Sequence, residues 1–99
     1  MRKGREVRTL PIDRIAFIRG ADDFSELHLD DGSSHLHQKT LAALEALLPD
    51  PFVRIHRSYI ANLARARGLR AASLVLEDGR LLPIGRSYRE GVRGRLGVE

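Results

Sequence analysis

The feature that most constrains this chain is a stretch near its middle, residues 52–63, which reads FVRIHRSYIANL. Val53 and Ile55 alternate with Arg54 and His56, which is the period of a strand with one buried face. A run of polar residues follows, and aliphatic residues then return. The pattern therefore predicts a strand, a tight turn and a second strand.

Four polar residues, His56, Arg57, Ser58 and Tyr59, occupy the predicted turn. An arginine presents a planar fork that fits guanine edges or phosphate, and the other three side chains can donate hydrogen bonds to phosphate oxygens. The same residues could instead form a solvated corner of the fold. Their chemistry alone leaves both interpretations open.

The stretch closely resembles the signature of the LytTR family of bacterial DNA-binding domains. In that family a phenylalanine, an arginine-isoleucine-histidine-arginine-serine run and a downstream asparagine recur, and here these are Phe52, residues 54–58 and Asn62. The resemblance also covers, in the right order, residues 11–18, 39–41, 44–49 and 82–88.

The resemblance implies a mainly β domain, an elongated β-β-β arrangement of small antiparallel sheets with one short helix between the halves and one at the C-terminus. It implies that loops enter successive major grooves of duplex DNA, with Arg86 and Arg57 at base-contacting positions. It further implies binding to direct-repeat sites and attachment to a receiver or other sensory domain. One loop departs from the family, because Asp22, Asp23 and Phe24 replace a common glycine-asparagine-tyrosine. Two carboxylates there would repel DNA.

The charge of the chain is unevenly distributed. The net charge is +4, yet residues 1–50 carry seven basic and nine acidic groups (−2), while residues 51–99 carry ten basic and four acidic groups (+6). A localised positive field attracts a polyanion through counterion release. The basic half, which also holds the polar turn, therefore favours nucleic acid as the partner.

The length of 99 residues fits one domain, and we expect residues 1–99 to form it, with an ordered core over about 6–97 and a flexible segment 1–5. The absence of cysteine excludes disulfides, a thiolate nucleophile and sulfur-ligated zinc. No apolar run is long enough to span a bilayer, and the basic N-terminus lacks a signal peptide. We therefore expect a cytoplasmic protein without a membrane partner.

The first half reads as strands over residues 6–10 and 15–18, a loop at 20–23 and a hairpin over 27–37. Asp31-Gly32 predicts a two-residue type I′ turn in that hairpin. This register pairs Leu27 with Leu36, His28 with His35 and Glu26 with His37. Three histidines and a glutamate on one face could bind a metal or respond to pH, but alternation alone also places polar residues on a wet face. We therefore predict no metal site and no cofactor.

The remaining elements are a helix, a second hairpin and a terminal helix. Residues 41–48 have helical period, with Thr40 as the cap and a leucine stripe that covers the sheet. Asp78-Gly79 predicts another two-residue turn, which pairs Glu77 with Arg80 and Leu76 with Leu81, and Pro83 marks the returning strand as an edge or a strand end.

The terminal helix is predicted to begin with a capping box formed by Ser87 and Glu90. Arg86 and Arg89 in its first turn would point cations and backbone amide donors in the same direction, which is an arrangement that binds phosphate. An ordinary terminal helix with solvated arginines is the alternative. On either interpretation, one face of the helix, bearing Tyr88, packs on the core.

Three classes of function remain to be compared. An enzyme is disfavoured because no third group orients His56 toward Ser58, and no glycine-rich phosphate loop is present. A non-catalytic RNA-binding or protein-interaction β-domain is the alternative to a DNA-binding transcriptional regulator, but the five aromatic residues offer no stacking platform. The predicted DNA-binding residues are Asp23, Phe24, Lys39, His56, Arg57, Ser58, Arg86, Ser87, Tyr88 and Arg89.

Overall fold

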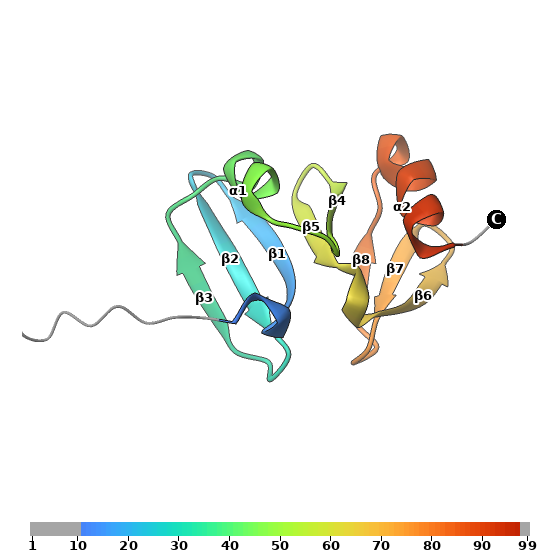
Figure 1. Cartoon of the computed structure of the whole chain (residues 1–99), viewed down its shortest axis with the longest axis horizontal. Helices are drawn as coiled ribbons and strands as arrows, with labels where there is room; N and C mark the ends of the chain where they lie inside the picture. The colour runs from blue at the N-terminus through green and yellow to red at the C-terminus, as the bar shows by residue number, and fades with distance from the viewer. Residues whose placement is uncertain (1–10, 98–99) are drawn as a thin grey trace, which may run out of the picture.

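Two antiparallel sheets and two short α-helices make up the computed structural model, which describes residues 11–97 (Figure 1). One sheet has the strand order β3-β2-β1-β5-β4 and the other has the order β6-β7-β8. The molecule extends over 56 × 24 × 20 Å. The prediction of an elongated, mainly β domain with one helix between the halves and one at the C-terminus is confirmed.

The elements follow one another along the chain, with 3₁₀ turns written η. Their order is η1 (Ile12–Arg14), β1 (Ile15–Ala21), β2 (Phe24–Leu29), β3 (Ser34–His37), α1 (Leu41–Leu47), β4 (Phe52–His56), β5 (Tyr59–Asn62), η2 (Leu63–Arg65), β6 (Ala66–Arg70), β7 (Ser73–Leu76), β8 (Leu81–Pro83), η3 (Arg86–Tyr88) and α2 (Arg89–Leu96). The predicted strand over residues 6–10 and the predicted flexible segment 1–5 lie outside the described residues.

Strand β1 is the middle strand of the five-stranded sheet and is buried on both faces, as its apolar run predicts. A bulge between Ile15 and Phe17 shifts the register against β2. The bulge changes the alternation, so that Ile15 and Ile18 pack on the side of α1, while Phe17 packs on the side of the three-stranded sheet. One strand therefore contributes to two cores.

The first core lies between the two sheets and α2, and the second lies between the five-stranded sheet and α1. The buried residues of the first core are Phe17, Ile55, Ala61, Leu74, Leu76, Leu82, Ile84 and Val92. Those of the second core are Ile15, Ile18, Leu29, Leu41, Leu44, Phe52 and Ile60. The stretch 52–63 supplies buried residues to both cores, which explains its apolar positions.

Helix α1 begins and faces the sheet as predicted. The Thr40 hydroxyl accepts a hydrogen bond from the Ala43 backbone N–H at 3.2 Å, which caps the helix. Leu41 and Leu44 are buried against the sheet, whereas Leu47 is 65% exposed. The short helix is therefore a cover for the sheet. Within residues 11–97, no helix has the length and apolar character needed to cross a membrane.

Both predicted hairpin registers are wrong by one residue. In the first hairpin Leu27 pairs with His35 and His28 with Ser34, and the β2–β3 loop is closed by the Leu29 N–H bonded to the Ser33 carbonyl at 2.9 Å. The loop therefore has three residues, with Gly32 at its end at φ 89°. A three-residue loop of this kind needs only one positive φ, whereas the predicted type I′ turn needs two.

The second hairpin departs from the prediction in the same way. The Leu76 N–H is bonded to the Arg80 carbonyl at 2.9 Å, and Gly79 at the end of the loop has φ 91°. Leu76 therefore pairs with Arg80, and Val75 with Leu81. The proline prediction holds, because Pro83 is the last residue of the edge strand β8.

The new register separates the hairpin histidines. Because opposite residues share a face, His28 and Glu26 lie on one side of the sheet, and His35 and His37 lie on the other. The shared face expected for His28 and His35 does not exist. Within the described residues no group of three or more metal-ligating side chains comes together.

Two local expectations also change. The predicted loop over residues 20–23 is shorter, because Gly20 and Ala21 continue β1 and only Asp22 and Asp23 form the turn before Phe24. The C-terminal helix begins with the 3₁₀ turn η3, so Ser87 lies inside that turn, and α2 has no side-chain cap at its N-terminus. The predicted capping box is therefore wrong.

Candidate nucleic-acid interface

The side chain of Arg54 holds the turn between β4 and β5 in place. Its guanidinium donates to the backbone carbonyls of His56 and Arg57 at 2.9 and 2.7 Å, and to the Glu45 carboxylate of α1 at 2.7 Å. The Arg54 side chain is only 16% exposed. Arg54 therefore has a structural role, because its guanidinium holds the two carbonyls that define the turn.

The side chain of His56 is oriented within the same turn. Its Nδ1 accepts a hydrogen bond from the Ser58 backbone N–H at 3.0 Å. In the neutral imidazole the proton must then lie on Nε2, so that Nε2 is the donor. The turn therefore presents an imidazole N–H together with the Arg57 guanidinium and the Ser58 hydroxyl.

A second corner, between β8 and α2, lies beside this turn. The Gly85 N–H donates to the Ile55 carbonyl at 2.8 Å, and the Tyr88 N–H donates to the Gly85 carbonyl at 2.9 Å. A Cβ at position 85 would lie 3.0 Å from Tyr88 Cδ2 and 3.7 Å from His56 Cα. Any larger residue at position 85 would require the Tyr88 ring to shift, so glycine favours this close approach.

Two further segments join the same side of the molecule. The Gly20 N–H donates to the Ser58 carbonyl at 2.9 Å, which places the β1–β2 turn beside the β4–β5 turn. The buried Ser25 hydroxyl donates to the Lys39 carbonyl at 2.6 Å, which holds the connection into α1. A hollow of about 320 Å³ lies between these two segments and the β4–β5 turn.

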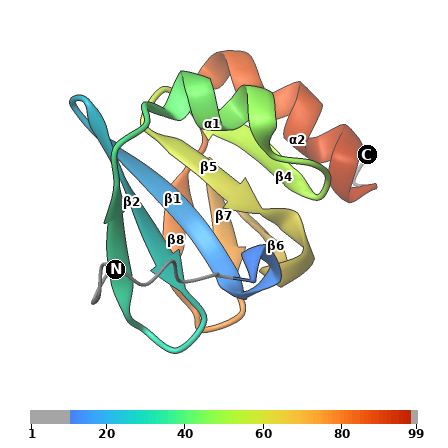
Figure 2. The same cartoon turned by 60° about the vertical axis from the view of Figure 1, so that its left-hand side comes forward.

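The four segments form one continuous border, which we call the recognition edge. In Figure 1 they lie along the upper side of the molecule, and the turned view in Figure 2 keeps them there. The recognition edge comprises Asp22, Asp23, Phe24, Lys39, His56, Arg57, Ser58, Gly85, Arg86, Ser87, Tyr88 and Arg89. All ten residues predicted from the sequence lie on it.

The side chains of this edge differ in exposure. Most of them are exposed: Asp23, Phe24, Lys39, Arg57, Arg86, Ser87 and Arg89. His56, Ser58 and Tyr88 are partly buried, and Tyr88 packs against the core between the sheets.

The cations of the recognition edge have no carboxylate partner in the part of the chain that is described. No ion pair to an acidic side chain forms there at Lys39, Arg57, Arg86 or Arg89. Arg95, further along α2, is paired with Asp50. The charge along this edge is therefore available to an external anion.

A neighbouring arginine shows the opposite arrangement. Arg19 in β1 donates to both carboxylate oxygens of Glu26, at 3.0 and 3.1 Å. These two hydrogen bonds, together with one to His28, lower the pKa of Glu26 below its ordinary value, and the pairing with Glu26 raises the pKa of Arg19. The positive charge of Arg19 is therefore balanced by Glu26, close to the recognition edge.

Sequence reasoning missed the two glycines that allow the segments to meet. A Cβ at Gly20 would lie 3.0 Å from Leu41 Cδ1 of α1, and Gly85 is equally constrained. The signal was a glycine next to a polar corner in each case. Asn62, the asparagine of the family signature, is buried and donates to the Ile15 carbonyl at 2.9 Å, so it connects β5 to β1.

The comparisons with known proteins identify a family and a shared fold. A family model described as the LytTr DNA-binding domain matches residues 5–97. A solved LytTr DNA-binding domain of a methyl-accepting/DNA response regulator from Bacillus cereus superposes with a TM-score of 0.76 at 22% identity, covering 97% of this chain and 93% of that one. The fold is therefore shared with that domain.

Relatives with curated names are longer proteins. The chain is 36% identical over 91 residues to the CO-responsive transcriptional regulator RcoM of Rhodospirillum rubrum, covering 85% of this chain and 38% of RcoM. It is 27% identical over 94 residues to the transcriptional regulatory protein BtsR of Escherichia coli, covering 90% of this chain and 38% of BtsR. The sensory transduction protein LytT of Bacillus cereus matches at 26% over 103 residues, covering 90% of this chain and 42% of LytT. The chain thus spans less than half the length of each of these relatives.

Proposed function

Because the chain belongs to the LytTR family of DNA-binding domains, we propose that it binds double-stranded DNA sequence-specifically as the DNA-binding part of a bacterial transcriptional regulator. The observation that carries this proposal is the recognition edge. Its exposed arginines have no carboxylate partner among the described residues, and hydrogen-bonded turns hold them in place. Family membership favours DNA over RNA or protein as the partner, and it implies a binding role in place of catalysis.

Arg57 and Arg86 are the residues that we assign to base reading. Each lies on one of the two adjoining corners, which the Gly85–Ile55 hydrogen bond holds together. An arginine fork can make two parallel hydrogen bonds to the O6 and N7 atoms of guanine in the major groove. Loops, and not a helix, would then enter the groove.

His56, Ser58, Tyr88 and Arg89 are assigned to phosphates. The donor on His56 Nε2 is directed by the Ser58 bond to Nδ1, and the hydroxyls and the Arg89 guanidinium supply further donors. Contacts of this kind fix the register of a protein on the duplex without reading its sequence.

The outer segments of the edge complete the proposed interface. Lys39 and Ser87 can donate to phosphate oxygens, and the Phe24 ring, 37% exposed, offers an apolar contact to a thymine methyl. Asp23 can accept a hydrogen bond from a cytosine amino group, which is a contact that a carboxylate can make inside a major groove.

The larger assembly is also part of the proposal. Since the chain spans 38% of RcoM and of BtsR, we propose that a receiver or another signalling domain controls it. Two copies would occupy direct repeats about one helical turn apart, on the same face of the duplex. Such a regulator would act in the cytoplasm, where the bacterial chromosome lies.

Selection of bound duplexes from a random pool, read at two salt concentrations, tests the proposal. We expect an enriched sequence whose affinity falls with salt with a log–log slope of about −4 to −7, which corresponds to roughly five to eight neutralised phosphates. A flat response to salt would refute nucleic-acid binding. Footprints that protect one half-site on every selected duplex would refute the direct-repeat arrangement alone.

A further inference from the structure

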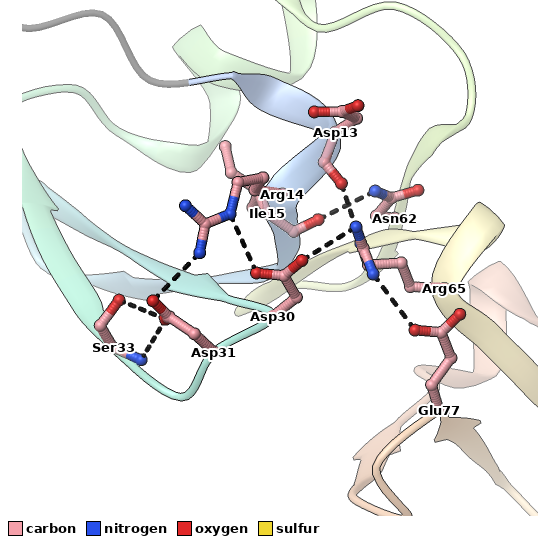
Figure 3. Close-up of polar contacts among 9 residues, drawn as sticks. All are labelled: Asp13, Arg14, Ile15, Asp30, Asp31, Ser33, Asn62, Arg65 and Glu77. Atoms are coloured by element: carbon pink, nitrogen blue, oxygen red, sulfur yellow. Dashed lines mark hydrogen bonds and ion pairs between the residues drawn. The ribbon is translucent and has the colours of Figure 1, made fainter.

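Polar and charged side chains form a continuous network (Figure 3). The segments that carry it, η1 and the β2–β3 and β7–β8 loops, lie along the lower side of the molecule in Figure 1, opposite the recognition edge. We call this network the ionic edge, and it consists of Arg14, Asp30, Asp31, Ser33, Arg65 and Glu77. Arg14 bonds Asp30 at 3.1 Å and Asp31 at 3.0 Å, so it fastens both acidic residues of the β2–β3 loop. The network therefore begins within the five-stranded sheet.

Arg65 carries the network across to the three-stranded sheet. Its guanidinium donates to the Asp13 carbonyl at 2.8 Å, and it pairs with the Asp30 carboxylate at 3.1 Å and with the Glu77 carboxylate at 3.2 Å. The Arg65 carbonyl also accepts from the Glu77 N–H at 2.9 Å. One residue thus connects η1 and the β2–β3 loop to the β7–β8 loop.

Arg65 lies in the segment of the chain that passes from one sheet to the other. It is the last residue of η2, the segment that joins β5 of one sheet to β6 of the other. On the recognition edge the two sheets are joined at a different point, by the Gly85 N–H to the Ile55 carbonyl. Two attachments at opposite ends of a sandwich fix the angle between its sheets.

We propose that Arg65 is a positioning residue for DNA recognition: by joining the hairpin loops of the two sheets, it sets the spacing of the Arg57 and Arg86 corners. The inference rests on the proposed function. Arg65 lies on the opposite edge and acts through the packing of the sheets, so it contributes to the discrimination between duplexes and not to a DNA contact.

A matched pair of arginine variants separates this role from simple loss of charge. Arg65→Met and Arg67→Met each remove one positive charge, but Arg67 is exposed and has no ion pair within residues 11–97. Loss of charge alone would weaken binding equally in both variants. We expect Arg65→Met to bind the selected duplex about fivefold more weakly than Arg67→Met, as suits the loss of several partly exposed polar contacts.

A pair of carboxylate variants gives a prediction of opposite sign. Glu77→Met and Asp78→Asn each remove one negative charge from the β7–β8 loop, and only Glu77 contacts Arg65. Asparagine can keep the local bond in which the Asp78 side chain accepts the Arg80 N–H at 2.9 Å. Electrostatics alone would strengthen DNA binding in both variants. Positioning by Arg65 predicts that Glu77→Met binds the selected duplex more weakly than Asp78→Asn, by about twofold or more.

A distance measurement without DNA completes the test. The chain has no cysteine, so exposed positions Ser34 and Arg70, one in each sheet, can be replaced by cysteine and spin-labelled. We expect a broader distance distribution in Arg65→Met than in Arg67→Met. If random duplexes and the selected duplex weakened by the same factor, or if the matched variants behaved alike, the positioning role would be overturned. Failure of the unmodified chain to bind any duplex would refute the proposed function, and the label distances would still decide whether Arg65 tethers the sheets.

Discussion

The recognition edge and the ionic edge contain the same kinds of residue and use them in opposite ways. On the ionic edge Arg14 and Arg65 are paired with Asp30, Asp31 and Glu77. On the recognition edge Arg57, Arg86 and Arg89 have no acidic partner within the described residues. The difference lies in where the carboxylates are placed and not in the number of arginines.

The two edges show why net charge is a coarse guide to an interface. Residues 1–50 have a net charge of −2, and residues 51–99 have a net charge of +6. Lys39 of the recognition edge nonetheless belongs to the acidic half, and Arg65 of the ionic edge belongs to the basic half. An anion responds to the local field near the surface, because salt screens charges that lie more than about 10 Å away.

The largest effect on DNA affinity is expected for the two arginines that we assign to base reading. Arg57→Ala or Arg86→Ala should weaken binding to the selected duplex by about 1–3 kcal/mol and leave random-duplex binding much less affected, because a bidentate base contact carries discrimination. Fluorescence titration of both duplexes measures the two affinities. An equal loss on both duplexes, with an unchanged melting temperature, would contradict base reading.

Arg14→Ala is the matched change on the ionic edge. It removes the same charge from a residue that is bonded to Asp30 and Asp31. We expect a lower melting temperature and little change in the ratio of selected to random affinity. A large loss of specificity in this variant would contradict the different roles assigned to the two edges.

The next effect concerns the support of the recognition edge. Arg54→Ala removes the donors to the His56 and Arg57 carbonyls and should lower the free energy of unfolding by about 2 kcal/mol, together with DNA affinity. Urea denaturation gives the first quantity and titration the second. Undiminished stability would show that the turn keeps its shape without Arg54.

A smaller effect is expected from the close approach of the two corners. Gly85→Ala places a Cβ 3.0 Å from Tyr88 Cδ2 and should cost about 1 kcal/mol of stability. Gly91→Ala, inside α2 with nothing within 4 Å of the new Cβ, should be neutral or stabilising by up to about 1 kcal/mol. Denaturation of the two variants side by side checks the contrast, and a stabilised Gly85→Ala would refute the steric argument.

The smallest effect is the dependence of stability on pH at the ionic edge. Hydrogen bonds from Ser33, with help from Arg14, lower the pKa of Asp31 from 3.8 to about 2. A carboxyl with a depressed pKa stabilises the fold above its unfolded value and loses that contribution as the pH falls toward the folded value. The melting temperature should therefore fall between about pH 4 and pH 2, and less steeply in Asp31→Asn. Parallel curves for the two proteins would contradict this assignment.

Periodicity predicted much of the fold. The alternation around Val53 and Ile55, the apolar run that starts at Ile15 and the cap at Thr40 all appear in the structure as expected. Each depends on local spacing along the chain, which the sequence shows directly.

The same reasoning could not predict the strand register of the two hairpins. An Asp-Gly pair fits a two-residue turn and a three-residue loop equally well at the sequence level, because both place glycine at positive φ. The side chains of Asp31 and Asp78 bond the backbone N–H two residues on, at Ser33 and Arg80. Such a bond is local chemistry that could have favoured the longer loop.

In the candidate site, too, local positions could be predicted from the sequence, whereas contacts between distant segments could not. Residue chemistry and family resemblance point to ten candidate residues along the chain, and their contacts with DNA stay a prediction. The contact that joins the two corners of the site was not predicted, since Gly85 meets Ile55 across 30 residues of chain through the packing of two sheets. Arg65 was missed for a similar reason, because its partners come from three separate parts of the chain.

Strands β1 and β5 are shared by both cores, and this determines how the domain unfolds. Because β1 sends Phe17 into one core and Ile18 into the other, and β5 does the same with Ala61 and Ile60, neither core can melt while its neighbour stays intact. The shared strands couple the cores into one cooperative unit. Loss of either core therefore abolishes the whole recognition edge in a single all-or-none transition.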